Sequence, residues 1–259
     1  EEGAATRAIG DGTTVDKLIW AVYDDQGQNI SDLNGEKSTS FPTQVEITLA
    51  KGQTYSIAFW AQNSSVNAYT FAPETHKIAI DYAGVNNDEA RDAFFKTVQH
   101  TVTGDIALDV TLERPFAQIN LGVTQEDWDA AETAGITVTK SEVVISNAAT
   151  KLDLFNGKVS DGEEVTYTAE VIPSEALLAD FDKDGVKENY KYLSLSYILV
   201  CDEGQTPDAE NMFGAQSSLV NTTFTLSTTK APVVVKVDNL PVRRNWRTNV
   251  VGELLTGDI

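Results

Sequence analysis

Hydrophobic and polar residues alternate with a period of two along most of this chain. Apolar side chains occupy every second position within residues 45–49, 105–113, 165–171 and 233–237. This period is typical of β-strands that have one buried face and one face in water. Further strands are predicted over residues 15–23, 54–61, 76–82, 116–123, 136–146, 150–155, 190–201, 220–227 and 246–255.

Helical signals are few and short. Residues 87–95 begin with a capping Asn or Asp and an acidic first turn, and residues 124–132 begin with a Thr cap and stop before Gly135. A third helical turn is predicted over residues 174–178, after Pro173. Many strands with sparse crossover helices predict an all-β sandwich architecture.

Two local signals indicate how the strands are connected. Asn156-Gly157 suits a tight hairpin turn, since both residue types tolerate a positive φ. Pro115 lies between two strand patterns, where it cannot donate to a strand ladder. We therefore predict one β-sandwich domain over residues 1–113 and a second over residues 114–259, a division that the length of 259 residues allows.

The charge balance limits the classes of partner. The formal net charge is -20 and is divided evenly between the two predicted domains. A field of this sign repels phosphate backbones and anionic lipid, so we expect neither a nucleic-acid partner nor a membrane-surface partner. No run approaches the roughly 20 apolar residues of a membrane span. Glu1 is not a natural start, so we expect that an N-terminal address has been removed.

Signals for chemistry are weak. The single cysteine, Cys201, excludes an internal disulfide and follows an apolar run, as a buried inert thiol does. The two histidines, His76 and His100, have no Cys or carboxylate at a metal-ligand spacing, and no nucleophile elbow or phosphate-cradling loop is present. We therefore predict no catalytic residue and no cofactor. A hydrolase with residues assembled in space is the least favoured alternative.

One acidic turn resembles the start of a calcium loop, in which oxygen ligands converge on a hard cation. The pattern fails at its twelfth position, which is Lys191 and not a bidentate Glu. An acidic turn that leads into the strand at 190–201 is the favoured interpretation, with Gly185 supplying backbone freedom. The weaker alternative is a calcium site formed by Asp180, Asp182, Asp184 and Glu188.

Aromatic residues gather at Tyr55, Phe59, Trp60, Tyr69 and Phe71, which leaves a glycan-binding surface open as an alternative. Alternation places Tyr55 and Phe59 on one face of a strand, where a core role is favoured, and Trp60 on the other face.

The C-terminal segment is the most distinctive part of the chain. Only six arginines are present, and three of them, Arg243, Arg244 and Arg247, fall within five positions. The cluster leads directly into an apolar alternating segment. Salt bridges with neighbouring carboxylates are the simple interpretation of these charges, and such exposed pairs contribute only about 0–1 kcal/mol each.

Four segments resemble the fimbrillin family, the subunits and relatives of type V pili on diderm bacteria. Residues 87–95 look like the family's Asp-Glu-x-Arg-Asp-Ala-Phe segment, and residues 114–121 are similar to the strand that opens its second domain. Residues 190–200 resemble a strand that follows an acidic turn. Residues 241–256 are close to the family's end motif, a Val-x-Arg-Asn-x-Arg-Thr-Asn run that leads to Gly-x-Leu-Leu-Thr.

The resemblance implies two tandem transthyretin-like Greek-key β-sandwich domains, export as a lipoprotein and assembly at the outer membrane surface. In better-known pilins an arginine-specific protease removes the first strand, and a strand from the next subunit fills the groove. Arg7 followed by Ala8 fits that cleavage site. The strand-pairing motif corresponds to Arg243, Arg244, Asn245, Trp246, Arg247, Thr248, Leu254 and Leu255.

Two departures from the family pattern are a missing lipidated cysteine and a chain that stops near where a further strand begins in many relatives. We expect that a lipid anchor has been removed, and that the further strand is absent or lies beyond this numbering. We predict a non-enzymatic fimbrial subunit or tip adhesin that binds other fimbrial subunits by strand insertion. The alternative is a monomeric glycan-binding surface lipoprotein with Trp60 or Trp246 as an aromatic platform.

Overall fold

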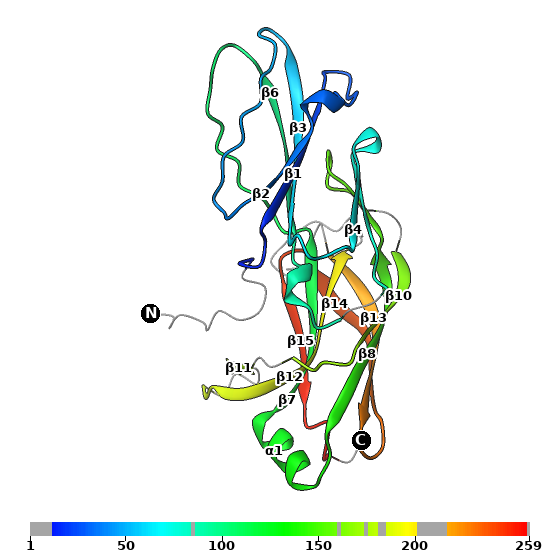
Figure 1. Cartoon of the computed structure of the whole chain (residues 1–259). Coiled ribbons are helices and arrows are strands. Elements are labelled where there is room, and N and C mark those ends of the chain that lie inside the picture. Colours follow the sequence, from blue (N-terminus) through cyan, green and yellow to red (C-terminus); the bar gives the residue numbers. More distant parts are fainter. Residues whose placement is uncertain are drawn as a thin grey trace.

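In the computed structural model the chain is almost entirely β-structure. The structure describes residues 12–83, 86–159, 162–173, 176–180, 185–200 and 217–257. Within these ranges there is one α-helix, and no helix is long and apolar enough to cross a membrane. The predicted all-β fold class is therefore confirmed. Figure 1 shows an elongated molecule with a four-stranded sheet at its upper end and the larger sheet below.

The upper sheet has the strand order β2-β1-β3-β6 and is antiparallel throughout. Its two central strands carry apolar residues on both faces, because each face packs against a different cluster. The 3-10 helix η1 (Ser31–Leu33) precedes β2. The strands are β1 (Lys17–Tyr23), β2 (Gly35–Ser38), β3 (Thr54–Gln62) and β6 (Phe94–Thr101).

The larger sheet divides by its pairing into two four-stranded runs. One run is β14-β13-β8-β10 and the other is β11-β12-β7-β15, and they join at a corner where Leu199 and Val200 pair with Ala149 and Ala148. Side chains from both runs meet in one buried cluster, as in a β-sandwich. The strands are β7 (Phe116–Thr124), β8 (Val138–Ala149), β10 (Gly162–Ala169), β11 (Ala176–Ala179), β12 (Glu188–Val200), β13 (Ser217–Thr228), β14 (Val233–Arg243) and β15 (Arg247–Gly252).

A small third sheet lies between these two assemblies. It has the order β4-β5-β9, from β4 (Tyr69–Ala72), β5 (Lys77–Ile80) and β9 (Lys151–Asp153), with the 3-10 helix η2 (Pro73–Thr75) between the first two. β5 and β9 lie on opposite sides of residue 113, so strands from the two predicted domains pair directly. The main core cluster also includes residues from both, such as Trp60 and Phe116. The division at residue 113 stays a prediction.

The helix predicted at residues 124–132 is confirmed as α1 (Gln125–Thr133). Its cap is the Thr124 hydroxyl, which accepts a hydrogen bond from the Asp127 backbone N–H. Ala134 ends the helix, and Gly135 follows it with a φ of 70°. The predicted turn at Asn156-Gly157 is also present, with Gly157 at a φ of 68°, but it closes between Asp153 and Lys158 and is not a two-residue hairpin.

Four predicted elements are wrong. Residues 87–95 are not one helix. The Asp88 side chain accepts a hydrogen bond from the Ala90 N–H and caps only a short 3-10 helix, η3 (Glu89–Arg91), after which the chain continues into strand β6. Residues 176–179 form strand β11, which pairs with β12, and not a helical turn. The segments 45–49 and 105–113, which alternate strictly, join no strand ladder of the described residues, although Glu113 makes a single bridge to Phe95 of β6.

Candidate functional site

The two faces of the upper sheet differ in what covers them. Trp60 and Ala58 on β3 point toward the main core, whereas the neighbouring side chains on β3 point to the opposite face. We call that opposite face, together with the segments 43–49 and 105–112 that lie against it, the outer face. Its buried cluster is Val15, Leu18, Val22, Tyr55, Ile57, Phe59, Ala61 and Val102.

The two segments of the outer face run in opposite directions. Residues 43–49 lead to Gly52, and residues 105–112 lead away from Val102. At this end the Gly52 N–H donates to the Val102 carbonyl over 2.7 Å, and the Val102 N–H donates to the Gln53 carbonyl over 2.9 Å. Alternate apolar side chains from both segments pack against the cluster and remain only partly buried: Val45, Ile47, Leu49, Val110 and Leu112.

The backbone of these segments makes few contacts with the rest of the described structure, one being the hydrogen bond that the Lys37 side chain donates to the Gln44 carbonyl over 2.9 Å. Neither 43–49 nor 105–111 makes a backbone–backbone hydrogen bond with another described residue. The apolar alternation of segment 105–112 also includes Ile106 and Leu108, which are 61% and 44% exposed. Backbone N–H and C=O groups are obligatory hydrogen-bonding groups, so two extended segments of this kind can pair with a further strand.

The C-terminal motif turns sharply between β14 and β15. Asn245 has a φ of 59°, and its N–H donates to the Phe116 carbonyl. The Gln118 N–H donates to the Trp246 carbonyl, which starts the parallel pairing of β15 with β7. β15 is the last strand in the order of the large sheet, so this motif forms a sheet edge.

The side chains of the motif have separate roles. The Arg243 guanidinium lies over the Trp246 ring at 5.3 Å. Arg244 is buried, donates to the Gly157 carbonyl and lies over the Phe95 ring. The Thr248 hydroxyl donates to the Pro241 carbonyl over 2.8 Å, and Arg247 is exposed at the start of β15. The predicted arginine cluster is therefore divided: Arg243 contacts an aromatic ring, whereas Arg244 is buried and donates to a backbone carbonyl.

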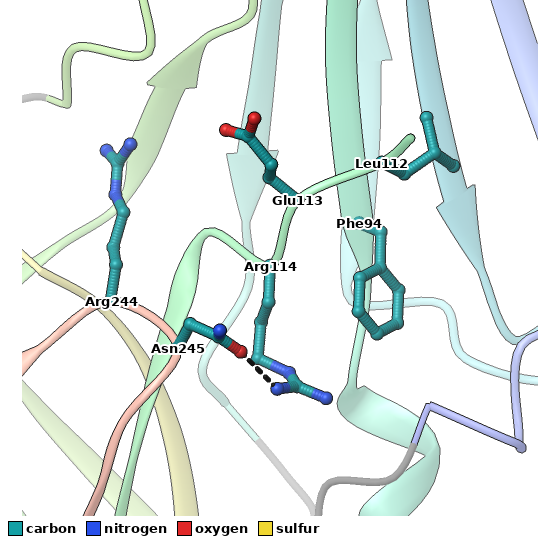
Figure 2. A pocket seen from close by; sticks show the side chains of 6 residues that line it. All are labelled: Phe94, Leu112, Glu113, Arg114, Arg244 and Asn245. Carbon is teal, nitrogen blue, oxygen red and sulfur yellow. Dashed lines mark hydrogen bonds between the residues drawn. The ribbon is translucent and has the colours of Figure 1, made fainter. Parts of the chain in front are cut away.

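Arg114 links the C-terminal motif to the upper sheet. Its guanidinium makes a two-point contact with Asp92, with N–O distances of 2.6 and 2.7 Å, and also donates to the Asn245 side-chain oxygen. Figure 2 shows the hydrogen bond between Arg114 and Asn245. Both residues line a pocket of about 370 Å³. Burial lowers the pKa of Arg114, but Asp92 outweighs that effect and raises it, so the guanidinium stays charged. The pocket is lined by Phe94, Leu112, Glu113, Arg114, Arg244 and Asn245.

The segment before β6 supplies further links between the two assemblies. The Arg91 guanidinium donates to the Tyr167 hydroxyl over 2.7 Å and to the Asp81 carbonyl over 2.9 Å. Glu89 accepts from the Gln118 amide and from the Tyr197 hydroxyl. Burial raises the pKa of Tyr197, which remains a neutral donor. These polar contacts bind the upper sheet to β7, β10 and β12.

Asp127 holds the end of the C-terminal motif. Its buried carboxylate accepts hydrogen bonds from the backbone N–H groups of Leu254, Leu255 and Thr256 over 2.8–2.9 Å, and from the Thr256 hydroxyl over 2.6 Å. Burial raises the pKa of Asp127, but these hydrogen bonds outweigh burial and hold it below its ordinary value. The sequence alone gave no sign of this role, because a carboxylate in the first turn of a helix already has a local explanation.

The remaining predicted sites have different outcomes. Arg7, Ala8, Cys201, Asp182 and Asp184 lie outside the described residues. The Asp180 carboxylate accepts from the Gly185 N–H, and the Glu188 carboxylate accepts from the Tyr190 hydroxyl. Within the described ranges no group of metal-ligating side chains occurs. A calcium site at this turn therefore stays a prediction.

The two tryptophans proposed as aromatic platforms differ in exposure. Trp60 is fully buried and donates to the Gln62 side chain over 2.8 Å, so it is not an exposed platform. Trp246 is 42% exposed. His76 stacks on Phe155 with ring centroids 4.1 Å apart, while His100 lies on β6 opposite Tyr55, so the two histidines belong to different clusters.

Comparison with solved structures shows the fold. A candidate adhesin from Bacteroides thetaiotaomicron matches with a TM-score of 0.50 and 13% identity, over 86% of this chain and 72% of that one. A candidate polysaccharide-binding protein from the same organism matches with a TM-score of 0.52 and 9% identity, over 92% and 82%. No curated protein matches the sequence. A family model matches residues 1–259, and the chain therefore belongs to DUF6562, a family of unknown function.

Proposed function

We propose that this protein is a non-enzymatic cell-surface subunit or tip adhesin that joins other fimbrial subunits by β-strand insertion at the outer face. One observation carries the proposal. Segments 43–49 and 105–111 have the side-chain pattern of strands and a backbone without ladder partners among the described residues. An extended peptide laid between them would make the missing hydrogen bonds and cover Ile106 and Leu108.

The energetics support a stable junction. An inserted strand buries its own apolar side chains at alternate positions and also completes the burial of Ile47, Leu49, Val110 and Leu112. Each large apolar side chain that becomes fully buried contributes roughly 1.5–3 kcal/mol. Four or five such positions would make dissociation slow, which suits a load-bearing surface structure.

Further support comes from the solved structures with the same fold. One is described as an adhesin and the other as polysaccharide-binding, and both descriptions are candidate assignments. Surface adhesion is consistent with an acidic chain that keeps colloidal stability outside the cell. Export as an outer-membrane lipoprotein, and proteolytic processing between Arg7 and Ala8, are further parts of the proposal.

Cleavage after Arg7 followed by electron microscopy and size-exclusion chromatography tests the proposal. We expect the cleaved chain to form ladders of multimers or filaments, alone or with a second fimbrial subunit. Arg7→Ala is the matched control and stays monomeric with the same protease. Ile47→Lys places a charge on the outer face and should abolish assembly, whereas Thr48→Gln, on the solvent side of the same segment, should not. A cleaved protein that remains monomeric at high concentration with every subunit tested contradicts strand insertion.

A second candidate function rests on Trp246. This ring is 42% exposed with the Arg243 guanidinium over it, an arrangement that can stack a sugar ring. In this alternative the monomer binds glycans at the cell surface. Titration calorimetry with saccharides found on a glycan array distinguishes the two functions. The glycan-binding alternative is favoured if the monomer binds a saccharide, if Trp246→Ala loses that binding, and if no strand exchange is seen.

A further inference from the structure

His100 lies on the outer face. Its neighbours on β6, Phe94 and Val98, pack against the outer-face cluster, whereas Phe95 packs in the main core. Successive side chains of a strand point to opposite faces, so His100 points the same way as Val98. The register places it opposite Tyr55 of β3, next to the end of the sheet where Val102 meets Gly52.

The His100 imidazole is incompletely satisfied. Its Nε2 atom is buried and has no hydrogen-bond partner among the residues that the structure describes. Buried polar atoms of folded proteins almost always have a partner, since leaving one unpaired is unfavourable. Either imidazole tautomer can be satisfied by a hydroxyl group, which both donates and accepts. The outer face therefore has one position at which an apolar side chain of an occupant is a poor fit.

The solvent side of the outer face is acidic. The positions that alternate with the apolar ones include Glu46, Asp105 and Asp109, and all three are exposed. A strand inserted between the two segments would bring its own outward side chains beside these carboxylates. Opposite charges on neighbouring strands stabilise pairing, and like charges destabilise it. A strand of the same acidic kind from a second copy of this chain is disfavoured for this reason.

We propose that the outer face selects an extended peptide with a defined pattern: apolar side chains inward, one inward hydroxyl side chain beside His100, and lysine or arginine outward. This inference rests on the proposed strand insertion and names the chemistry of its partner. The partner is then a basic-faced strand of another protein. His100 acts as the residue that fixes the register of the inserted strand, because only one register brings the hydroxyl to Nε2.

Synthetic peptides of about ten residues test the pattern, a length typical of long strands. The parent alternates valine inward with lysine outward, and a series moves one inward serine stepwise along it. Fluorescence anisotropy measures the dissociation constant with the full chain, before and after cleavage following Arg7. We expect one serine position to bind about tenfold more tightly than the all-valine parent, as the gain of one buried hydrogen bond predicts.

Three variants assign that preference. His100→Leu should remove the serine preference, and His100→Gln should retain part of it. Gln99→Leu, on the same strand but the opposite face, should leave it unchanged. A peptide with glutamate in place of lysine should bind at least about tenfold more weakly at low salt, because the outward positions then repel Glu46, Asp105 and Asp109.

The outcomes separate the inference from the proposed function. Failure of every peptide to bind would contradict strand insertion itself. Binding that is independent of serine position and unchanged in His100→Leu would overturn the inference while strand insertion stands, and so would tighter binding of the glutamate peptide. Self-association of the chain through the outer face without peptide, abolished by Ile47→Lys, would overturn it as well. If His100→Leu does not fold, the serine series on the wild-type chain and on His100→Gln decides.

Discussion

Replacing Asp127 with alanine tests whether one carboxylate holds the C-terminal motif in place. The wild-type carboxylate accepts four hydrogen bonds at 2.6–2.9 Å from Leu254, Leu255 and Thr256. Hydrogen bonds to a charged group contribute about 1.5–3 kcal/mol each, but their sum is an upper bound because water can satisfy the segment once it detaches. Leu255, which is buried, would lose much of its packing in that case.

We therefore expect Asp127→Ala to lower the free energy of unfolding by about 3 kcal/mol, within the range for loss of a buried hydrogen-bonded network. For a chain of this size that corresponds to a fall in Tm of about 6–12 °C. Hydrogen exchange should show faster exchange of the amide protons of residues 254–256, and of the adjoining strand β15, than of β8 or β13.

Asp129→Asn is the matched control for this experiment. Asp129 lies two residues further along α1, is exposed and accepts a hydrogen bond from the Gln125 side chain, so its replacement should change stability by less than about 0.5 kcal/mol. Equal effects of the two substitutions, or an Asp127→Ala protein with unchanged protection at residues 254–256, would refute the assigned role of Asp127.

Three other outcomes follow from the described contacts. The pKa of Asp127 is held below its ordinary value, so its contribution to the free energy of unfolding is present above about pH 4 and is lost as the pH falls through the folded pKa. The protection of the residue 254–256 amides against hydrogen exchange should therefore be equal at pH 5 and pH 7 and should fall in more acidic solution. Arg114→Met should cost about 3–5 kcal/mol in urea unfolding, because it removes the two-point contact of the guanidinium with the buried Asp92 carboxylate. Asp92→Leu in the same chain should restore part of the loss, and an additive double variant would contradict this pairing. Trp60→Ala should cost about 3–5 kcal/mol of stability and Trp246→Ala less than about 1 kcal/mol, and equal losses of Tm would contradict the different burial of the two rings.

The sequence identified most strands because alternation reports directly on burial. Segments such as 54–61 and 116–123 have a one-sided or fully apolar pattern, and the structure places β3 and β7 there. The Thr124 cap similarly located α1, since a helix start depends on residues within one turn of it. The turn at Gly157 was predictable for the same reason, as a positive φ is a local property.

Alternation does not report on hydrogen-bonded pairing, and this is where sequence reasoning failed. Residues 45–49 and 105–113 alternate strictly, but pairing needs a neighbouring strand at a suitable distance, and among the described residues only Glu113 has one, through its bridge to Phe95. The mistaken helix at 87–95 has a related cause. Asp88 caps only one short turn, after which Arg91 contacts Tyr167 and Asp92 contacts Arg114, and the chain continues as a strand.

The sequence by itself therefore determined the fold class, the local turns and caps, and the positions of most strands, because each depends on neighbouring residues or on burial of one strand face. Only the tertiary structure decided that Trp60 is buried, that Asp127 receives the chain end, and that His100 faces an incompletely paired surface. Each of these depends on contacts between residues far apart in the chain, and the local pattern around each residue is compatible with several such partners.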